Sequence, residues 1–200
     1  IAYWRPYECV GQIRLSGCVA DVGIPDRTLR EARMDGAKTL VLGVANRGGV
    51  ISKSWLNTMF NAVEMGYNIA SGLHGLLNAI PELEKRADRA NVNLFNVRCS
   101  EIGSPVANGK KRLGKRLLTV GSDCSVGKMF TALAIERSLK KQGFNATFRA
   151  SGQTGIFIAG TGVCIDAVIS DFVAGAAELL SPDNDSDHWD IIEGQGSLFH

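Results

Sequence analysis

One short stretch of the chain, residues 115–131, constrains the fold more than any other. An apolar run of strand length at 117–120 leads into a turn between Gly121 and Gly127, and Lys128 then opens a helical pattern. In such a strand–turn–helix unit the backbone N–H groups of the turn point at one anion, with the positive end of the helix dipole behind them. The sequence therefore predicts a phosphate-binding loop, in which Lys128 follows the outer phosphates.

The loop departs from the general phosphate-loop pattern at two places. Five residues separate Gly121 from Gly127 where the pattern has four, and Met129 occupies the position of the magnesium-binding Ser or Thr. A thioether is a poor ligand for a hard cation, so magnesium would need another oxygen or would not be used. The longer loop, with Ser-Asp after its first glycine, resembles the loop of dethiobiotin synthetase. The predicted ligand-binding residues are Gly121, Ser122, Asp123, Cys124, Ser125, Val126, Gly127, Lys128 and Met129.

Strand-length apolar runs alternate with helical patterns along the chain, which predicts parallel sheets covered by helices on both faces. We expect an α/β protein with two three-layer domains, Rossmann-like and then P-loop NTPase-like of the dethiobiotin synthetase kind. Their expected bounds are 1–100 and 115–200, joined by a glycine-rich and cation-rich linker at 101–114. The expected strands are 38–45, 68–73, 92–97, 117–120, 145–149 and 188–193; the expected helices are 54–65, with Ser54 as N-cap, 76–89 and 128–142; glycine turns are expected at 151–155 and 159–162.

Composition narrows the class of protein. Of the 200 residues 45% are hydrophobic and 21% are charged, as in an ordinary globular chain. With no apolar run near the roughly 20 residues of a membrane helix and no secretion signal, we expect a cytoplasmic protein without a membrane partner. A net charge of +2 and a basic cluster at 110–116 without aromatic residues argue against nucleic acid, and we interpret that cluster as a solvated linker. The five scattered cysteines predict reduced, mostly buried thiols, with a packing role for Cys124.

Several acids could serve the loop or the chemistry. A phosphate loop needs an acid at the tip of a neighbouring strand to hold magnesium or its waters, and Glu193 ends the last predicted strand. Glu193 is therefore the metal ligand if magnesium is used, whereas Asp190 is expected at the strand edge. Asp166 and Asp171 lie in an otherwise apolar stretch, so at least one should be desolvated, and either could act as a general base. Either could instead cap a helix or pair with Arg149.

Candidate substrate residues follow the predicted strands, because open α/β sheets bind ligands at the carboxyl ends of their strands. An arginine at such a position, Arg47 or Arg149, could hold a substrate carboxylate by a bidentate contact. The histidine at the second strand is equally well explained as an exposed loop residue. The candidates are Asn46, Arg47, His74, Arg149, Gln153 and Thr154.

Four segments, 43–49, 118–129, 148–155 and 188–198, resemble a bacterial two-domain family. That family joins an N-terminal Rossmann-like domain to a C-terminal P-loop domain and includes D-glutamate N-acetyltransferase. The resemblance covers essentially the whole chain. Family members continue past the position of His200, so the resemblance implies a fragment that lacks the last part of its second domain.

The activity that this resemblance implies is transfer of an acetyl group from acetyl-CoA to the amine of D-glutamate, a small amino-acid substrate. Asp171 or Glu193 would be the base, and the loop amides with Lys128 would bind phosphates or the developing oxyanion. CoA carries phosphates, so a phosphate loop can bind it without the magnesium-dependent phosphoryl transfer that Met129 disfavours. We also expect a homo-oligomer.

Two alternatives remain open from the residues. The first is an ATP-dependent ligase of the dethiobiotin synthetase type, in which Glu193 and a hydroxyl such as Ser125 or Thr131 hold magnesium. The second is a non-catalytic sensor that binds an ATP-like or GTP-like nucleotide. Dependence of binding on magnesium separates the ligase from the acetyltransferase, and absence of turnover identifies the sensor.

Overall fold

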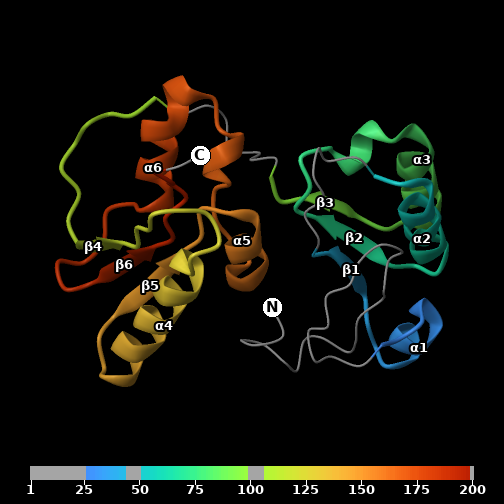
Figure 1. Ribbon diagram of the computed structural model, residues 1–200, viewed down its shortest axis with the longest axis horizontal. Helices are drawn as coiled ribbons and strands as arrows, with labels where there is room; N and C mark the ends of the chain where they lie inside the picture. The colour runs from blue at the N-terminus through green and yellow to red at the C-terminus, as the bar shows by residue number, and fades with distance from the viewer. Residues whose placement is uncertain (1–25, 44–50, 99–105, 199–200) are drawn as a thin grey trace. The chain divides into compact units, whose positions relative to one another are not determined.

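The computed structural model describes residues 26–43, 51–98 and 106–198 of the chain (Figure 1). The chain divides into two compact units, Ile1–Val97 and Arg98–His200. Each unit contains a parallel three-stranded sheet, with strand order β1-β2-β3 in the first and β4-β6-β5 in the second. The predicted α/β class with two parallel sheets is confirmed, while the assignment of 101–114 as a linker stays a prediction. No helix in the described ranges is long and apolar enough to cross a bilayer.

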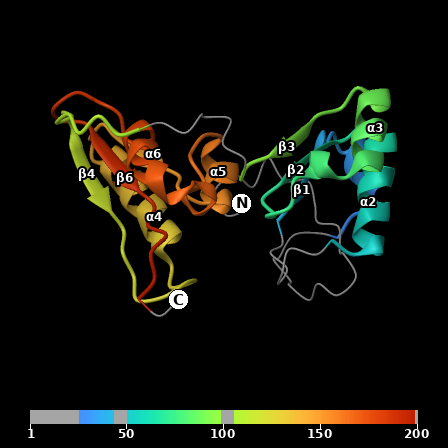
Figure 2. The same cartoon turned by 90° about the horizontal axis from the view of Figure 1, so that it is seen from above.

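In the first unit, two helices pack against one face of the sheet (Figure 2). The strands are β1 Thr39–Leu42, β2 Asn68–Ser71 and β3 Leu94–Asn96, and the helices are α1 Leu29–Met34, α2 Lys53–Glu64 and α3 Pro81–Ala90, with a 3-10 turn at Leu77–Ala79. The core between this face and the helices α2 and α3 is formed by Leu42, Met59, Val63, Ile69, Leu83 and Ala87.

Two predicted helix boundaries in this unit are wrong by a few residues. Ser52, not Ser54, is the N-cap of α2, because Ser52 is extended and its hydroxyl accepts a hydrogen bond from the Trp55 amide. The helix expected at 76–89 is split into the 3-10 turn and α3. The split falls at Ile80, whose extended backbone follows from the proline at position 81.

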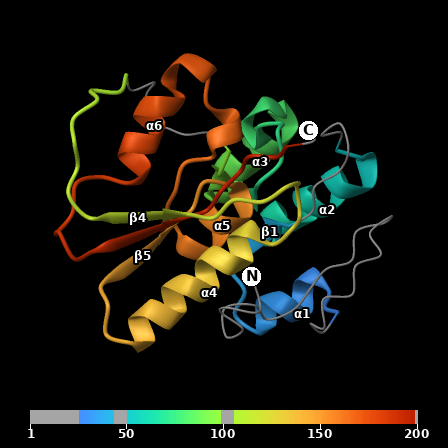
Figure 3. The same ribbon diagram turned by 60° about the vertical axis from the view of Figure 1, so that its left-hand side comes forward.

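In the second unit, helices cover both faces of the sheet. The strands are β4 Lys115–Leu118, β5 Ala146–Arg149 and β6 Trp189–Ile192, and the helices are α4 Lys128–Lys141, α5 Gln153–Ala159 and α6 Val173–Leu180, with 3-10 turns at Ile165–Ala167 and Ser170–Phe172. Ile192 of the central strand packs with Leu180 of α6, and the preceding Ile191 points to the opposite face. Figure 3 shows α4 and α6 on opposite sides of this sheet. In register, Leu118 and Arg149 both lie beside Ile192, so the three strands end at one edge.

The segment expected as a glycine turn at 151–155 instead begins the helix α5. Its N-cap is Gly152, and the carboxylate of Glu193 accepts hydrogen bonds from the backbone amides of Ser151 and Gly152. An acid from a neighbouring strand thus satisfies amides at the start of a short helix that has no side-chain cap of its own. This contact joins residues about forty positions apart in sequence, which is why local patterns do not reveal it.

The basic cluster that was expected to be solvated is only partly so: Lys110, Lys111 and Lys115 are exposed, whereas Arg112 contacts the end of α6. The guanidinium of Arg112 donates to the carbonyl oxygens of Ala177, Glu178 and Ser181 at the end of α6, where helix carbonyls lack partners. The carboxylate of Glu178 in turn accepts hydrogen bonds from the backbone amides of residues 108 and 109. Residues 108–112 are therefore attached to the second unit.

Candidate functional site

The loop between β4 and α4 makes a tight turn that depends on its glycines. A Cβ added at Gly121 would lie 2.5 Å from Cγ2 of Val126, so only glycine allows this close approach. Ser125 and Gly127 have positive φ values of 57° and 96°, and Gly127 is the N-cap of α4. The predicted strand–loop–helix unit is present, and its role in ligand binding stays a prediction.

Two side chains of the loop region, Asp123 and Lys128, form hydrogen bonds with the loop backbone. The ammonium group of Lys128 donates to the carbonyl oxygen of Asp123 at 2.7 Å, and the Cys124 amide donates to the Asp123 carboxylate at 2.6 Å. Lys128 thus lies over the loop, where it could reach a bound phosphate by exchanging one acceptor for another. Cys124 is exposed, so the packing role expected for it is wrong, whereas Cys164 is buried as expected of the thiols. Met129 is half-buried in the first turn of α4.

Glu193 lies at the tip of the central strand β6, between the strand that carries the loop and β5. Its Oε2 accepts hydrogen bonds from the amides of Ser151 at 3.0 Å and Gly152 at 3.1 Å. The next residue, Gly194, donates to the Thr119 hydroxyl at 3.2 Å, and a Cβ added there would overlap the Thr119 carbonyl oxygen. The chain just beyond Glu193 therefore passes in direct contact with the chain that enters the phosphate loop.

Glu193 is only 6% exposed, and this burial is the main influence on the pKa of its carboxyl group. Desolvation raises the pKa of this carboxyl above its usual value, and hydrogen bonds from the Ser151 and Gly152 amides and from Gln195 oppose that rise. The carboxylate is thus a stronger base than an exposed glutamate. Such a group suits proton transfer near neutral pH.

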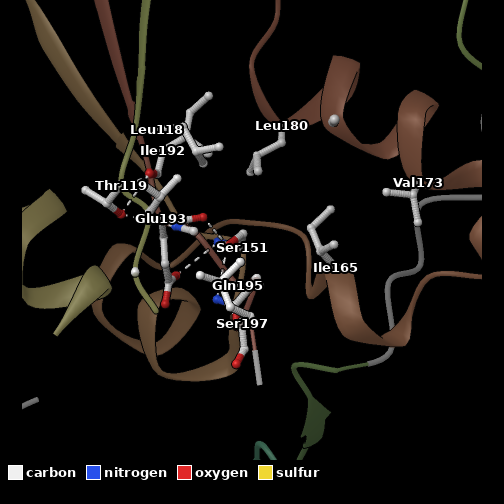
Figure 4. A pocket seen from close by; sticks show the side chains of 16 residues that line it. Leu118, Thr119, Ser151, Ile165, Val173, Leu180, Ile192, Glu193, Gln195 and Ser197 are labelled. Carbon is white, nitrogen blue, oxygen red and sulfur yellow. Dashed lines mark hydrogen bonds between the residues drawn. The ribbon is translucent and has the colours of Figure 1, made fainter. Parts of the chain in front are cut away.

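A pocket of about 440 Å³ opens beside Glu193 (Figure 4). Its walls are mainly apolar and come from the strand ends, the 3-10 turn and α6: Leu118, Ile165, Val173, Leu180 and Ile192. Its polar lining comes from Thr119, Ser151, Glu193, Gln195 and Ser197. Gly121 of the phosphate loop also lines it. One pocket therefore adjoins both the candidate base and the start of the phosphate loop.

We expected at least one of Asp166 and Asp171 to be buried, and the structure shows both of them exposed. Asp171 is exposed in the 3-10 turn before α6, and it is not among the described residues that line the pocket. Asp166 is partly exposed, forms an ion pair with Arg98 rather than Arg149, and accepts a hydrogen bond from the Cys164 thiol. Both side chains reach solvent because 3-10 turns, not a continuous buried helix, occupy this stretch. A catalytic role for Asp171 stays a prediction.

Arg149 pairs with Asp190 in the interior of the second unit. Its Nε lies 2.7 Å from Oδ1 of Asp190, and the Ser181 hydroxyl donates to Oδ2 at 2.6 Å. Asp190 is only 1% exposed, so the expectation of a strand-edge residue is wrong. β6 is the central strand of a sheet whose two faces are covered by helices, so Asp190 is buried, and its charge is stabilised by its guanidinium partner.

The other candidate substrate residues are distributed over the chain. Gln153 and Thr154 form the start of α5, and His74 is exposed after β2 in the first unit. Asn46 and Arg47 lie outside the described residues. Of the described candidates, His74 therefore belongs to the first unit and Arg149, Gln153 and Thr154 to the second, and the roles of all six stay predictions.

Two polar residues at the site, Ser151 and Gln195, are absent from the sequence-based candidates. Both lie next to glycines, in Ser-Gly after β5 and in Gly-Gln-Gly after β6, at the carboxyl ends of adjacent strands. Their position could have identified both residues from the sequence, because ligands bind at the carboxyl ends of strands in open sheets.

A magnesium ion would find few protein ligands at this site. Within the described ranges no three His, Cys, Asp or Glu side chains are grouped as a metal site. Glu193 would have to bind the ion together with hydroxyl groups, ligand phosphates or water, as magnesium often does.

Comparison with protein families matches residues 13–100 to the DUF1611_N Rossmann-like domain and residues 105–200 to the DUF1611_C P-loop domain, both described as domains of unknown function. The chain is 56% identical over 197 residues to a D-glutamate N-acetyltransferase of Tritonibacter scottomollicae, covering 98% of this chain and 59% of that protein. It is 51% identical over 200 residues to a protein of the same name from a Pseudoalteromonas species, covering all of this chain and 60% of that protein. A crystal structure of a DUF1611 family protein from Anabaena variabilis, 34% identical, superposes with a TM-score of 0.79 over 88% of this chain and 52% of that one. The chain thus spans about 60% of the length of these curated relatives.

Proposed function

Since this chain belongs to the DUF1611 family of proteins with a Rossmann-like and a P-loop domain, we propose that the whole protein transfers an acetyl group from acetyl-CoA to the amine of D-glutamate. Two relatives that match nearly the whole chain carry the name of that activity. The structural observation that carries the proposal is the placement of Glu193. This buried carboxylate lines the same pocket as Gly121, where the phosphate loop begins.

The phosphate loop suits the phosphates of CoA. Its amides and the ammonium group of Lys128 can bind an anion at the start of α4 without a metal ion. Met129 occupies the position where phosphoryl-transfer enzymes place a magnesium-binding hydroxyl. Acetyl transfer breaks a carbon–sulfur bond and leaves the CoA phosphates intact, so it has no need of that hydroxyl.

The pocket and Glu193 suit the chemistry of the acyl group. Apolar walls such as Ile165 and Leu180 would contact the uncharged arm and acetyl group of the donor. The substrate amine attacks the thioester carbonyl, a carbon–nitrogen bond forms, and the CoA thiolate leaves and takes up a proton. Glu193 accepts the proton that the attacking nitrogen loses, as a base whose pKa is raised by burial.

A product assay on the full-length protein tests this proposal directly. The protein is incubated with acetyl-CoA and either D-glutamate or L-glutamate, and N-acetylglutamate is measured by mass spectrometry with and without magnesium. We expect product from D-glutamate, independent of magnesium. Absence of acetylated product from every amino acid tried, while acetyl-CoA still binds, would reject the acetyltransferase.

Lys128→Ala tests the phosphate loop separately from the chemistry. Loss of a charged hydrogen bond to phosphate is worth about 1.5–3 kcal/mol, which corresponds to weakening of acetyl-CoA binding by about 10-fold to 150-fold. Lys141→Ala, at the far end of the same helix, removes the same charge and should leave the affinity within about twofold. Equal effects of the two variants in titration calorimetry would mean that the loop does not bind the phosphates.

An ATP-dependent ligase is the second candidate, favoured by the acid at the strand tip next to the phosphate loop. It predicts tight binding of ATP only with magnesium. Calorimetry with ATP and with acetyl-CoA, each with and without magnesium, distinguishes the two reactions. Binding of a nucleotide without turnover of any amine would instead favour the sensor.

A further inference from the structure

One side of the pocket beside Glu193 is formed by a single face of the helix α6. Val173, Ala177 and Leu180 line the pocket, and their spacing along the helix places them on one face. Ile165 of the preceding 3-10 turn continues this surface. We call these four residues the α6 wall. All four side chains are hydrocarbons, so the wall suits an uncharged, apolar part of a ligand.

The polar lining of the pocket lies away from the α6 wall. Figure 4 shows Ile165 and Val173 across the pocket from Thr119 and Glu193. Gly121, where the phosphate loop begins, lines the pocket as well. The phosphates of CoA suit the loop, and the polar groups of the reaction suit the side of Glu193. The α6 wall is then left for the group that the donor carries on its thioester.

The α6 wall is held in place by contacts with the rest of the second unit. Leu180 is 7% exposed and packs in a core cluster with Val163 and Ala176. On the backbone side, the guanidinium of Arg112 donates to the carbonyl oxygen of Ala177 at 3.4 Å. A wall that is already formed does not have to be ordered when a ligand binds, so apolar contact with it contributes to affinity with little opposing cost.

Ala177 leaves space on this wall. Its side chain is a single methyl group between the larger Val173 and Leu180 of the same helix face, and it is exposed. An acetyl group also carries only one methyl, so it covers a small part of four apolar side chains. Each further methylene that a ligand buried here would improve its affinity by about fourfold.

We propose that the α6 wall binds the acyl chain of the donor, and that the protein transfers propionyl and butyryl groups as well as acetyl. The inference rests on the proposed function, in which the donor is an acyl-CoA. Chain length leaves the reaction unchanged: the carbon–sulfur bond of the thioester breaks, a carbon–nitrogen bond forms, and the proton lost by the nitrogen ends on the CoA thiolate. The added methylenes lie along the wall, and the small side chain of Ala177 makes room for them.

A series of donors tests the binding site without any substitution. The full-length protein is titrated calorimetrically with acetyl-CoA, propionyl-CoA and butyryl-CoA in the absence of an amine. We expect the affinity to rise by about fourfold for each methylene, or about 16-fold from acetyl-CoA to butyryl-CoA. With D-glutamate present, kcat/KM for acyl transfer should rise in the same order.

Ala177→Leu tests the place where the chain binds. Leucine would fill the space between Val173 and Leu180, so the ratio of butyryl-CoA to acetyl-CoA affinity should fall from about 16 to about one or less. Ala174→Leu is the matched control: it is the same change on the same helix, at an exposed residue that is not among the described residues lining the pocket. Its ratio should equal that of the wild type. Melting temperatures show whether both variants are folded, and the wild-type series stands without them.

The outcomes separate this inference from the proposed function. Affinity that rises with chain length and loses this rise in Ala177→Leu, together with transfer of all three acyl groups, supports both. The same binding pattern with no acyl transfer to any amine supports the acyl site and overturns the proposed activity. Affinity independent of chain length, an equal loss for all three donors in Ala177→Leu, or transfer of acetyl alone overturns the inference.

Discussion

Replacement of Gly155 by alanine should destabilise the second unit, although the same change in an open helix position would stabilise it. Gly155 lies inside α5, where alanine is favoured over glycine by about 1 kcal/mol. A Cβ at this position would, however, overlap Oε2 of Glu193 and lie 3.1 Å from Cδ of Glu193 and from Cβ of Ala150. The carboxylate has to move, because the alternative is a contact that real side chains do not make.

The magnitude follows from the hydrogen bonds that would be lost. Oε2 accepts from the buried amides of Ser151 and Gly152, and a hydrogen bond to a charged group contributes about 1.5–3 kcal/mol. After allowance for the helix preference and for partial relaxation, we expect Gly155→Ala to lower the free energy of unfolding by about 2–4 kcal/mol. Urea denaturation measures the loss, and hydrogen exchange at the Ser151 and Gly152 amides should show where protection is lost.

A double-mutant cycle isolates the cause. In a Glu193→Ala background the overlapping carboxylate is gone, so Gly155→Ala should be near neutral and the coupling energy should approach the full loss. Gly75→Ala is a control for the loss of a glycine, because a Cβ there meets nothing within 4 Å. Stabilisation by Gly155→Ala alone, or the same loss in both backgrounds, would refute the placement of the carboxylate against Gly155.

Three other predictions concern buried and exposed groups of the second unit. Glu193→Gln should change the pH dependence of stability. Because the pKa of Glu193 is raised in the native state, that state binds more protons than the unfolded state at pH values between the ordinary and the raised pKa, and wild-type stability falls as the pH rises through this window. The variant, measured by urea denaturation at several pH values, should lose this slope, and a constant difference between the two proteins would contradict the prediction. Burial raises the pKa of the Cys164 thiol to about 12, whereas Cys124 is exposed. Peptide mapping after alkylation at pH 8 should therefore show Cys124 reacting at least about 10³-fold faster than Cys164, and acetyl-CoA should protect Cys124. Equal labelling of the two thiols would contradict the burial of Cys164 and the exposure of Cys124. Asp190→Ala should lower the free energy of unfolding by about 3–5 kcal/mol, because it leaves the half-buried guanidinium of Arg149 without its carboxylate. Replacement of both residues by apolar ones should recover much of the loss, and additive effects of the two changes would argue against the pair.

Patterns of short range were enough to predict the class of fold. The alternation of apolar runs with helical stretches led to two parallel sheets, and the spacing of Gly121, Gly127 and Lys128 led to the strand–loop–helix unit. The same holds for Glu193 at the tip of a strand beside the one that carries the loop. These features follow from residue periodicity and from backbone conformations that glycine allows, so the local sequence contains them.

Contacts between distant segments decided what the patterns left open or predicted wrongly. The helix α5 begins where Glu193, from another strand, accepts the hydrogen bonds of two amides, and a glycine-rich sequence alone predicts a turn there. Asp190 is buried because β6 became the central strand, an order that no single segment specifies. Arg112 binds the end of α6, although its sequence neighbours are mostly exposed cations. In each case a charged side chain contacts groups that are distant in the sequence. The free energy of such a contact depends on how deeply the charged group is buried, which only the tertiary structure determines.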